Sequence, residues 1–323
     1  MDEPIDSENV DNTFAEEVLS GLSSEKKHLS CKYIYDNQGS ELFQQIMRLP
    51  EYYPTDCEAE ILDAYSEDIA SDIEADSFTL IELGAGDGLK TRILLDHFLE
   101  DMIDFQYVPI DISQSAVEGL LADLHNDFEE LNVHGLVAEY FSGLEYLSTM
   151  DEHVKLVLFL GSNIGNMKNN DAVDFLKHLH DVLNNGDYLL IGFDLKKDAS
   201  VLNRAYNDSK GVTEAFNFNI LERINRELGG NFDTERFYFY STFDPTAGAV
   251  KSYLISTIEQ DVYIKNLHRT FHFKKEEPLH TESSHKYSIE EIYSFAKKSG
   301  FECINNYYDN RNFFVDSLWK VVK

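Results

Sequence analysis

The sequence predicts an α/β fold: a doubly wound parallel sheet joined to a second, smaller α+β domain. Between residues 78 and 193, short apolar runs alternate with helical patterns, which is typical of a parallel sheet covered by helices on both faces. Three glycines at alternate positions follow the first apolar run, as in turns that approach a ligand closely. After residue 194, a helical stretch and several antiparallel strand patterns replace the alternation, which indicates a separate domain.

The sheet domain is predicted from five strands and the helices between them. The strands are expected at residues 78–83, 107–110, 133–138, 154–160 and 188–193, and the helices at 91–99, 115–124 and 171–183. Right-handed crossovers between parallel strands bring the carboxyl ends of these strands to one edge of the sheet. Ligands of such sheets bind at that edge, so the residues that follow the strands are candidates for a site.

The flanking segments predict further helices and strands. Phe14, Val18 and Leu22 fall at helical spacing, Ser40 is a candidate N-cap for a second helix, and a third helix is expected from about residue 57 to 73. Beyond the sheet, residues 198–228 are expected to be mostly helical with Asn-rich interruptions, and a further helix is expected at 289–296. Strands are expected at 237–243, 250–258, 262–273, 301–308 and 313–321. The simplest division assigns residues 60–196 and 287–323 to the sheet domain, and residues 8–59 and 197–286 to the smaller domain.

The charge balance and the cysteines exclude several classes of partner. Lys and Arg number 27 against 59 Asp and Glu, a formal net charge of -32 that repels nucleic acid and anionic membranes. The three cysteines are scattered, so neither a disulfide framework nor a structural metal site is indicated. The acidic N-terminus lacks a signal-peptide core, and no apolar run is long enough to span a bilayer. We therefore expect a cytoplasmic protein, with a monomer as the simplest state.

The glycine turn predicts a nucleotide-type binding site. An apolar strand with Glu82 near its end leads into Gly84, Gly86 and Gly88, and a helical pattern follows. A strand, a glycine turn and a helix N-terminus together form such a site. The dinucleotide fingerprint needs a third glycine where Leu89 stands, so a nicotinamide oxidoreductase is disfavoured. The spacing favours S-adenosylmethionine (SAM); an ordinary glycine-rich turn is the alternative.

Polar residues follow the other strands at the same expected edge. Asp111 is placed to accept hydrogen bonds from ribose hydroxyls, or else to cap the next helix. Lys90 begins a helix, where a cation is unfavourable, so a ligand carboxylate would explain it better than a solvated surface position. Glu139 and Tyr140 either meet an adenine amino group or end the third strand in solvent. The segment 161–166 suits the polar groups of a substrate, although a structural turn fits it too.

Several ordered segments resemble one family, the histidine Nα-methyltransferases of ergothioneine biosynthesis. The matching segments are residues 32–36, 39–43, 49–55, the glycine turn, 160–166, 194–198, 205–208, 211–217, 225–228 and 281–284. The resemblance covers nearly the whole chain. It implies a Rossmann-like class I SAM-dependent methyltransferase sheet, with the smaller domain binding the substrate and the sheet domain binding SAM.

The resemblance also implies the site residues. Together with the glycine turn, it implies a SAM site made of Tyr35, Gly84, Gly86, Lys90, Asp111, Glu139 and Tyr140. It implies that the amino and carboxylate groups of the amino acid are held by Tyr52, Asn166 and Tyr206, with Gly161 nearby. Tyr52 and Asn166 are the candidate catalytic residues, because they would orient the amine. Glu282 and Ser284 would bind the imidazole, since a carboxylate accepts an imidazole N–H.

The chain departs from the family pattern at a few positions. On the cofactor side, Asp87-Gly88 stands where serine or threonine is usual, and Glu139 replaces an aspartate. On the substrate side, Asn163 replaces a threonine, and Ser252 stands where a methionine often lines the pocket. The same chemistry on another amino acid or amine is therefore an alternative to histidine. A non-catalytic SAM-binding regulator is a further alternative, against which the complete set of substrate residues argues.

Overall fold

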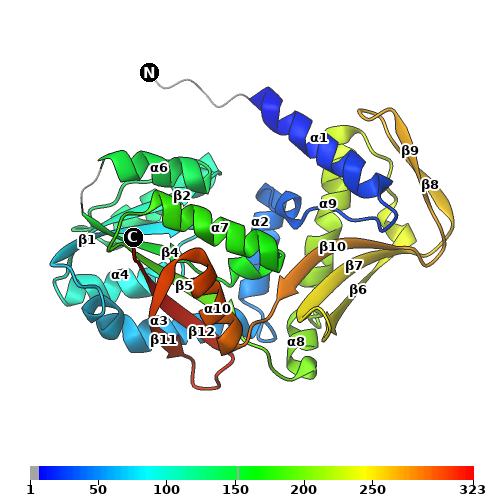
Figure 1. The fold of residues 1–323 in the computed structure, drawn as a ribbon. Coiled ribbons are helices and arrows are strands. Elements are labelled where there is room, and N and C mark those ends of the chain that lie inside the picture. Colours follow the sequence, from blue (N-terminus) through cyan, green and yellow to red (C-terminus); the bar gives the residue numbers. More distant parts are fainter. Residues whose placement is uncertain (1–6, 151–152) are drawn as a thin grey trace. The chain divides into compact units, whose positions relative to one another are not determined.

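The computed structural model describes residues 7–150 and 153–323 and divides the chain into two compact units (Figure 1). Unit 1 comprises the chain up to Tyr53 and the segment Lys197–Ser284, and unit 2 comprises Pro54–Lys196 and His285–Lys323. The sequence-based division has its boundaries after residues 59, 196 and 286. The first boundary falls earlier in the structure because nearly all of helix α3 (Tyr53–Ser71) belongs to unit 2.

Unit 2 is built on a seven-stranded sheet with the strand order β11-β12-β5-β4-β1-β2-β3. The strands are β1 (Ser77–Leu83), β2 (Asp104–Asp111), β3 (Leu136–Val137), β4 (Val154–Phe159), β5 (Tyr188–Asp194), β11 (Phe301–Tyr308) and β12 (Phe314–Val321). Strands β1 to β5 pair in parallel, whereas β12 is antiparallel to both β5 and β11. The chain runs outward from β1 in both directions, so the doubly wound α/β sheet is confirmed.

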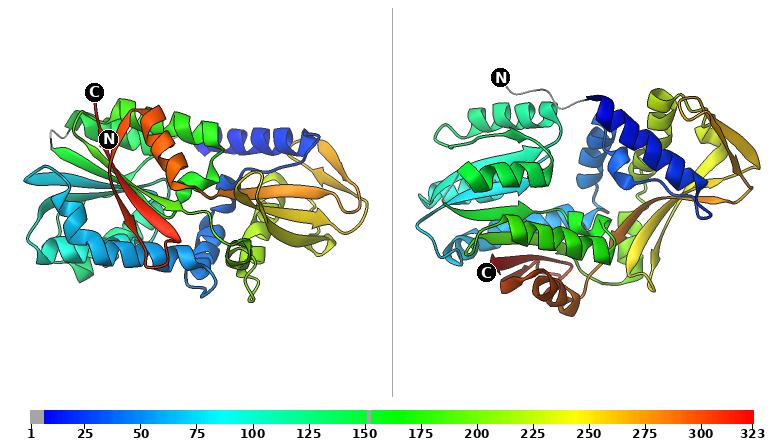
Figure 2. Two further views of the ribbon diagram at one scale, coloured as in Figure 1. Left: turned by 60° about the horizontal axis from the view of Figure 1, so that its bottom comes forward. Right: turned by 45° about the horizontal axis from the view of Figure 1, so that its top comes forward.

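Helices cover both faces of this sheet. They are α3, α4 (Thr91–Glu100), α5 (Gln114–Asp127), α6 (Tyr140–Met150), α7 (Asn169–Val182) and α10 (Ile289–Ser299). Figure 2 shows α3 and α4 on one face, and α6, α7 and α10 on the other. Alternate residues of the strands, such as Ile81, Val157 and Ile191, form one buried core with Leu176 of α7 and Phe295 of α10. Strand β5 is buried at every position, as expected for a parallel strand between two helical layers.

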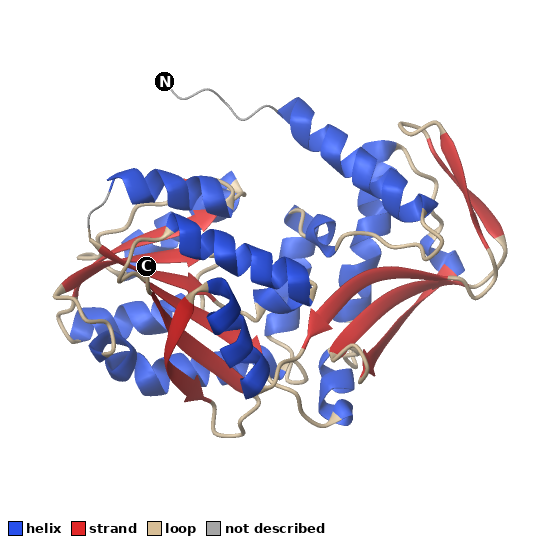
Figure 3. Ribbon diagram, in the orientation of Figure 1, coloured by secondary structure: helices blue, strands red, loops and turns tan. Residues whose placement is uncertain are grey.

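Unit 1 combines a small sheet with helices (Figure 3). Its three-stranded sheet has the order β10-β7-β6, and β8 and β9 form a separate hairpin. The strands are β6 (Phe237–Asp244), β7 (Ala249–Ser256), β8 (Gln260–Ile264), β9 (Arg269–Phe273) and β10 (Pro278–His285, whose last residue belongs to unit 2). The helices are α1 (Ser7–Ser23), α2 (Asn37–Met47), α8 (Ala199–Ala205) and α9 (Val212–Leu228), with short 3₁₀ turns at Cys31–Ile34 and Thr234–Arg236.

Four local expectations are wrong. The strand expected at 262–273 is the hairpin β8–β9, whose turn holds His268 at a positive φ of 48°. The N-cap of α2 is Asp36, whose carboxylate accepts a hydrogen bond from Gly39 N at 2.8 Å, and not Ser40. The third strand is only two residues long, and Tyr140 begins α6 instead of ending that strand. Strand β10 has no counterpart among the expected elements, because its run Thr-Glu-Ser-Ser lacks an apolar alternation.

Candidate active site

The glycine turn after β1 has the backbone geometry of a ligand-binding loop. Gly84, Gly86 and Gly88 have φ values of 71°, 56° and 63°, a region that side chains other than glycine rarely adopt. A Cβ at Gly84 would lie 2.6 Å from the hydroxyl oxygen of Tyr140, so packing also requires glycine there. A Cβ at Gly86 would meet no atom within 4 Å. The backbone at Gly86 is therefore open to a ligand, which fits a SAM site.

Asp111 faces this turn from the end of β2. Its Oδ2 atom lies 3.4 Å from Gly86 N, and its Oδ1 atom accepts a hydrogen bond from Ser113 N at 2.9 Å. The N-cap of α5 is Ser113, whose hydroxyl accepts from Ala116 N. Helix capping therefore does not explain Asp111, and ribose binding remains the prediction for this carboxylate.

Tyr140 lies against the glycine turn, whereas Glu139 beside it is exposed. The Tyr140 ring makes an edge-to-face contact with Phe159 of β4, at a centroid distance of 6.1 Å. Burial, together with the charges of Asp111 and Glu82, raises the pKa of Tyr140 to about 12. The hydroxyl of Tyr140 is therefore neutral at physiological pH and can donate a hydrogen bond. Contact of Glu139 and Tyr140 with adenine stays a prediction.

Lys90 pairs with a carboxylate of the protein itself. It is the N-cap residue of α4, and its ammonium forms an ion pair with Glu58 of α3. From the sequence, a ligand carboxylate is the expected partner of Lys90, and contact of Lys90 with SAM remains a prediction. Glu58 is not among the sequence-predicted site residues. The only local sign that Glu58 has a special role is its position in the helix. It lies one turn before the buried Ile61 and Leu62, on the apolar stripe of α3, where an apolar side chain would be expected.

The loop after β4 is held at several points. Gly161 and Ser162 both have left-handed backbones, with φ values of 76° and 54°. The backbone N–H of Gly161 donates to both carboxylate oxygens of Glu58, at 2.7 and 3.0 Å. The Ser162 hydroxyl accepts a hydrogen bond from Asp194 N, which ties the loop to the end of β5. The loop continues into a 3₁₀ turn at Asn163–Asn166, in which Asn166 is half-buried.

In unit 1, Glu282 and Ser284 lie on one face of β10. They are two residues apart on the strand, and their exposed fractions are 8% and 4%. Tyr206, which follows α8, donates a hydrogen bond from its hydroxyl to Ser284 Oγ at 2.7 Å. The structure therefore brings these three predicted substrate residues into one buried polar group.

Aromatic residues extend this group within unit 1. The rings of Tyr52 and Tyr206 are 6.1 Å apart, and Phe43 contacts both Tyr52 and Tyr35. Burial raises the pKa of Tyr35 well above its usual value, and the charge of Glu282 adds to this effect. Tyr35 was predicted to contact SAM, yet it lies in the same unit as the predicted substrate residues. The other predicted SAM residues, together with Gly161 and Asn166, belong to unit 2.

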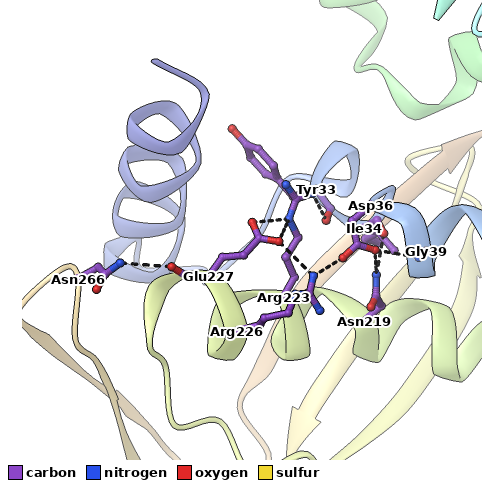
Figure 4. A network of polar contacts seen from close by, with 9 residues as sticks. All are labelled: Tyr33, Ile34, Asp36, Gly39, Asn219, Arg223, Arg226, Glu227 and Asn266. Atoms are coloured by element: carbon purple, nitrogen blue, oxygen red, sulfur yellow. Dashed lines mark hydrogen bonds and ion pairs between the residues drawn. The ribbon is translucent and has the colours of Figure 1, made fainter. Parts of the chain in front are cut away.

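A polar network on α9 fixes the segment that carries Tyr35 (Figure 4). Asn219 donates through its side-chain amide to Ile34 O at 2.9 Å and to the Asp36 carboxylate at 2.7 Å. Arg226 forms an ion pair with the same carboxylate, and Arg223 donates to Tyr33 O at 3.1 Å. Both neighbours of Tyr35 in sequence are therefore anchored to one helix.

The described residues contain neither a metal-type cluster of side chains nor a helix that could cross a membrane. Over residues 7–150 and 153–323, no three His, Cys, Asp or Glu side chains are grouped as a metal site would require. Within the same described segments, no helix has both the length and the apolar character needed to cross a membrane.

The sheet order with its reversed strand β12, and the open glycine turn at the carboxyl end of β1, define a class I SAM-dependent methyltransferase fold. The family described as "Histidine-specific methyltransferase, SAM-dependent" matches residues 14–321, and the chain belongs to this family. The expected enzyme class, a SAM-dependent methyltransferase, is thereby confirmed.

Named relatives match over most of the chain. Histidine N-alpha-methyltransferase from Mycobacterium tuberculosis is 37% identical over 302 residues, which are 94% of this chain and 93% of that protein. The protein of the same name from Mycolicibacterium smegmatis is 36% identical, covering 88% of this chain and 87% of its own length. Ergothioneine biosynthesis protein 1 from Schizosaccharomyces pombe is 30% identical over 92% of this chain and 40% of that longer protein.

Proposed function

We propose that this enzyme transfers methyl groups from SAM to the α-amino group of L-histidine and continues to the trimethyl betaine, hercynine. The observation that carries the proposal is the buried group on β10, where Glu282 and Ser284 share a face and Tyr206 donates to Ser284 Oγ. The two relatives that are named histidine N-alpha-methyltransferases support the same substrate, and the third relative supports a role in ergothioneine biosynthesis.

The buried group suits an imidazole because of its hydrogen-bonding pattern. A neutral imidazole carries one N–H donor and one acceptor nitrogen, a carboxylate only accepts, and a hydroxyl both donates and accepts. Glu282 can therefore take the imidazole N–H, which also selects one tautomer. An apolar side chain carries no donor for the Glu282 carboxylate, so it would gain no hydrogen bond at this position.

We assign SAM binding to the glycine turn, Asp111, Lys90, Tyr140 and Glu139, with Tyr35 as a further contact. SAM supplies an electrophilic methyl group when it is bound. The open backbone at Gly86 and the facing carboxylate of Asp111 support this assignment. We assign Tyr52 and Asn166, with Gly161 nearby, to the amino and carboxylate groups of the amino acid. Holding the amine in line with the methyl group is the main contribution that such residues make to the rate.

Three successive methylations require a site that tolerates a positively charged quaternary product. Tyr35, Tyr52 and Tyr206 belong to one set of aromatic rings in unit 1, and the electron-rich faces of such rings attract quaternary ammonium groups. This aromatic set supports trimethylation over a single transfer.

One experiment tests the function directly. The purified protein is incubated with SAM and each amino acid in turn, and mass spectrometry detects gains of one, two or three methyl groups. We expect histidine to be methylated and to accumulate as the trimethyl product, with activity surviving a metal chelator. Methylation of a different amino acid or amine, with none of histidine, would contradict histidine as the substrate and identify that compound in its place. Binding of S-adenosylhomocysteine with no methylated product would support a non-catalytic regulator and overturn the proposal.

We also propose that the protein acts as a cytoplasmic monomer on a small molecule. The net charge of -32 supports the absence of nucleic-acid and anionic-membrane partners. Native mass spectrometry tests the monomer, and a dimer mass would contradict it.

A further inference from the structure

Two of the buried acidic side chains in unit 2 lie close together and are not used by the proposed chemistry. Glu58 on α3 and Asp316 on β12 both have an exposed fraction of 0%. Burying a carboxyl group is costly unless it is paired, hydrogen-bonded or protonated, so each of these two needs a physical explanation.

Glu58 joins two of the loops in unit 2 that carry predicted site residues. Its carboxylate pairs with the ammonium of Lys90, at the start of the helix that follows the glycine turn. The same carboxylate accepts the Gly161 N–H in the loop after β4. A Cβ at Gly161 would lie 3.2 Å from Lys90 Nζ, so the ammonium rests directly against this glycine. Glu58 thus holds Lys90 and Gly161 together.

Asp316 lies beside Glu58 in the same buried space. It is opposite Gly192 of β5 in the sheet register. A Cβ at Gly192 would collide with Glu58 Oε1 and would lie 3.1 Å from Asp316 Oδ1, so both carboxyl groups lie over this one glycine. Neither oxygen of Asp316 has a hydrogen-bond donor within the described part of the chain.

A single proton shared by the Glu58–Asp316 pair explains how both carboxyl groups can be buried together. Two ionised carboxylates in such a small buried space would repel each other, and Lys90 supplies one positive charge, which pairs with Glu58. Burial and the neighbouring Glu58 raise the pKa of Asp316 well above its usual value, although Lys90 acts in the opposite direction. Asp316 is therefore the neutral member of the pair and can donate its O–H to Glu58.

We propose that Glu58 is a positioning residue for SAM binding: its carboxylate, with neutral Asp316 beside it, fixes Lys90 and the Gly161 turn. The proposal rests on the proposed function for the assignment of Lys90 to SAM. The proposal predicts that amide substitution of the two acids has different effects on cofactor affinity. A neutral amide is a good substitute for protonated Asp316 and a poor one for the Glu58 carboxylate. Glu58→Gln removes the charge that orients Lys90, whereas Asp316→Asn retains a neutral donor.

Calorimetric titration with S-adenosylhomocysteine tests this without any amino acid. We expect Glu58→Gln to weaken binding about tenfold or more, and Asp316→Asn to stay within about threefold of the wild type. Thermal unfolding of both variants is measured alongside. Equal effects of the two variants, the reverse order, or a lowered unfolding temperature for Glu58→Gln with unchanged affinity would each overturn the positioning role.

A double-mutant cycle with Lys90→Met provides a second test, which also serves if Glu58→Gln alone does not fold. Removing both charges leaves no unpaired ammonium, and we expect Glu58→Gln/Lys90→Met to bind S-adenosylhomocysteine about as weakly as Lys90→Met. A further tenfold loss in the double variant would overturn action through Lys90. If the wild-type protein itself fails to bind S-adenosylhomocysteine, the proposed function fails, which is a different result from any difference between variants.

Discussion

The Oε1 atom of Glu58 lies 2.7 Å from the backbone nitrogen of Gly161, although 103 residues separate the two in sequence. This bond connects helix α3, which precedes the sheet, to the loop that leaves strand β4. Gly161 also has a left-handed backbone, with a φ of 76°, a region that residues other than glycine rarely adopt. The conformation of this loop therefore depends on a carboxylate from a distant helix as well as on its own residues.

Removing the groups that orient the amine should reduce turnover and spare cofactor binding. We expect Tyr52→Phe and Asn166→Ala each to lower the turnover of histidine about 10- to 100-fold, because each loses a hydrogen bond to the reacting substrate. Affinity for S-adenosylhomocysteine should stay at the wild-type level. The exposed Tyr240→Phe serves as the control. Wild-type turnover in both variants would show that the site assignment is wrong.

Neutralising the buried carboxylate on β10 should affect the substrate more than the cofactor. We expect Glu282→Gln to raise the KM for histidine about tenfold or more, since a charge-assisted hydrogen bond to the imidazole is lost. Ser284→Ala should have a smaller effect of the same kind. Steady-state kinetics with varied histidine and saturating SAM measure this. A changed KM for SAM with an unchanged KM for histidine would contradict the assignment.

The network around Asn219 should contribute to stability as well as to the position of Tyr35. Asn219→Ala leaves Ile34 O and the Asp36 carboxylate each short of one donor inside the protein, which costs about 1–3 kcal/mol of unfolding free energy. Urea denaturation of the full chain measures the loss. Gln38→Ala, which removes an exposed contact with Glu222, is the control and should change stability by less than about 0.5 kcal/mol. Equal losses in the two variants would argue against the network.

Glu82 should make unfolding depend on pH. Burial raises its pKa from 4.5 to about 7, although hydrogen bonds from Thr91 and Tyr107 and the charge of Lys90 oppose the rise. Because the pKa of Glu82 is higher in the folded state, folding favours the protonated carboxyl group. The contribution of Glu82 to the free energy of unfolding is therefore fully present below pH 4.5 and is lost as the pH rises through 7.

We therefore expect Glu82→Gln to gain stability relative to the wild type as the pH rises from 5 to 8, by up to about 3 kcal/mol. Urea denaturation at several pH values measures the difference between the two proteins. The exposed Glu100→Gln controls for the loss of one negative charge. A difference for Glu82→Gln that stays constant over this pH range would contradict the prediction.

Alanine substitutions at Gly84 and Gly86 should destabilise the protein for different reasons. Alanine at Gly84 is strained by the positive φ and also collides with Tyr140, whereas alanine at Gly86 is strained by φ alone. We expect Gly84→Ala to lower the unfolding temperature more than Gly86→Ala. Adding Tyr140→Phe removes the colliding oxygen and should recover part of the loss at Gly84. No recovery in the double variant would mean that the contact with Tyr140 is not the cause.

Local patterns in the sequence predicted the sheet domain well. Strands β1, β4 and β5 are largely apolar runs in which nearly every residue is buried, and helices α4, α5 and α7 each follow a predicted helical periodicity. Strand β10 escaped prediction because most of its buried residues are polar: Thr281, Glu282 and Ser284 are buried, and Tyr206 donates a hydrogen bond to Ser284. The hairpin turn at residues 265–268 escaped it because the turn contains neither glycine nor proline, and His268 adopts the positive φ instead.

The site was only partly predictable for a related reason. Motifs and family resemblance indicated the residues that would meet a ligand. Glu58 and Asp316 carry no such signal, because their role depends on contacts with Lys90, Gly161 and each other that are distant in sequence. Asp316 stands within a strand that is almost entirely buried, and Glu58 stands on an apolar helix stripe. The one available clue to Glu58 and Asp316 was that each is an acidic residue at a position where the sequence periodicity predicts a buried side chain.

The place of β12 in the sheet has a consequence for how the protein is made. This strand follows all of unit 1 in sequence, yet it lies between β5 and β11. During translation, Glu58, Lys90 and Gly192 leave the ribosome long before Asp316 does, so the acid pair cannot form until unit 1 has also emerged. Until then, strand β5 has an unpaired edge, and Glu58 lacks its neighbour Asp316. We therefore expect the nascent sheet domain to depend on protection from aggregation until its last strands arrive.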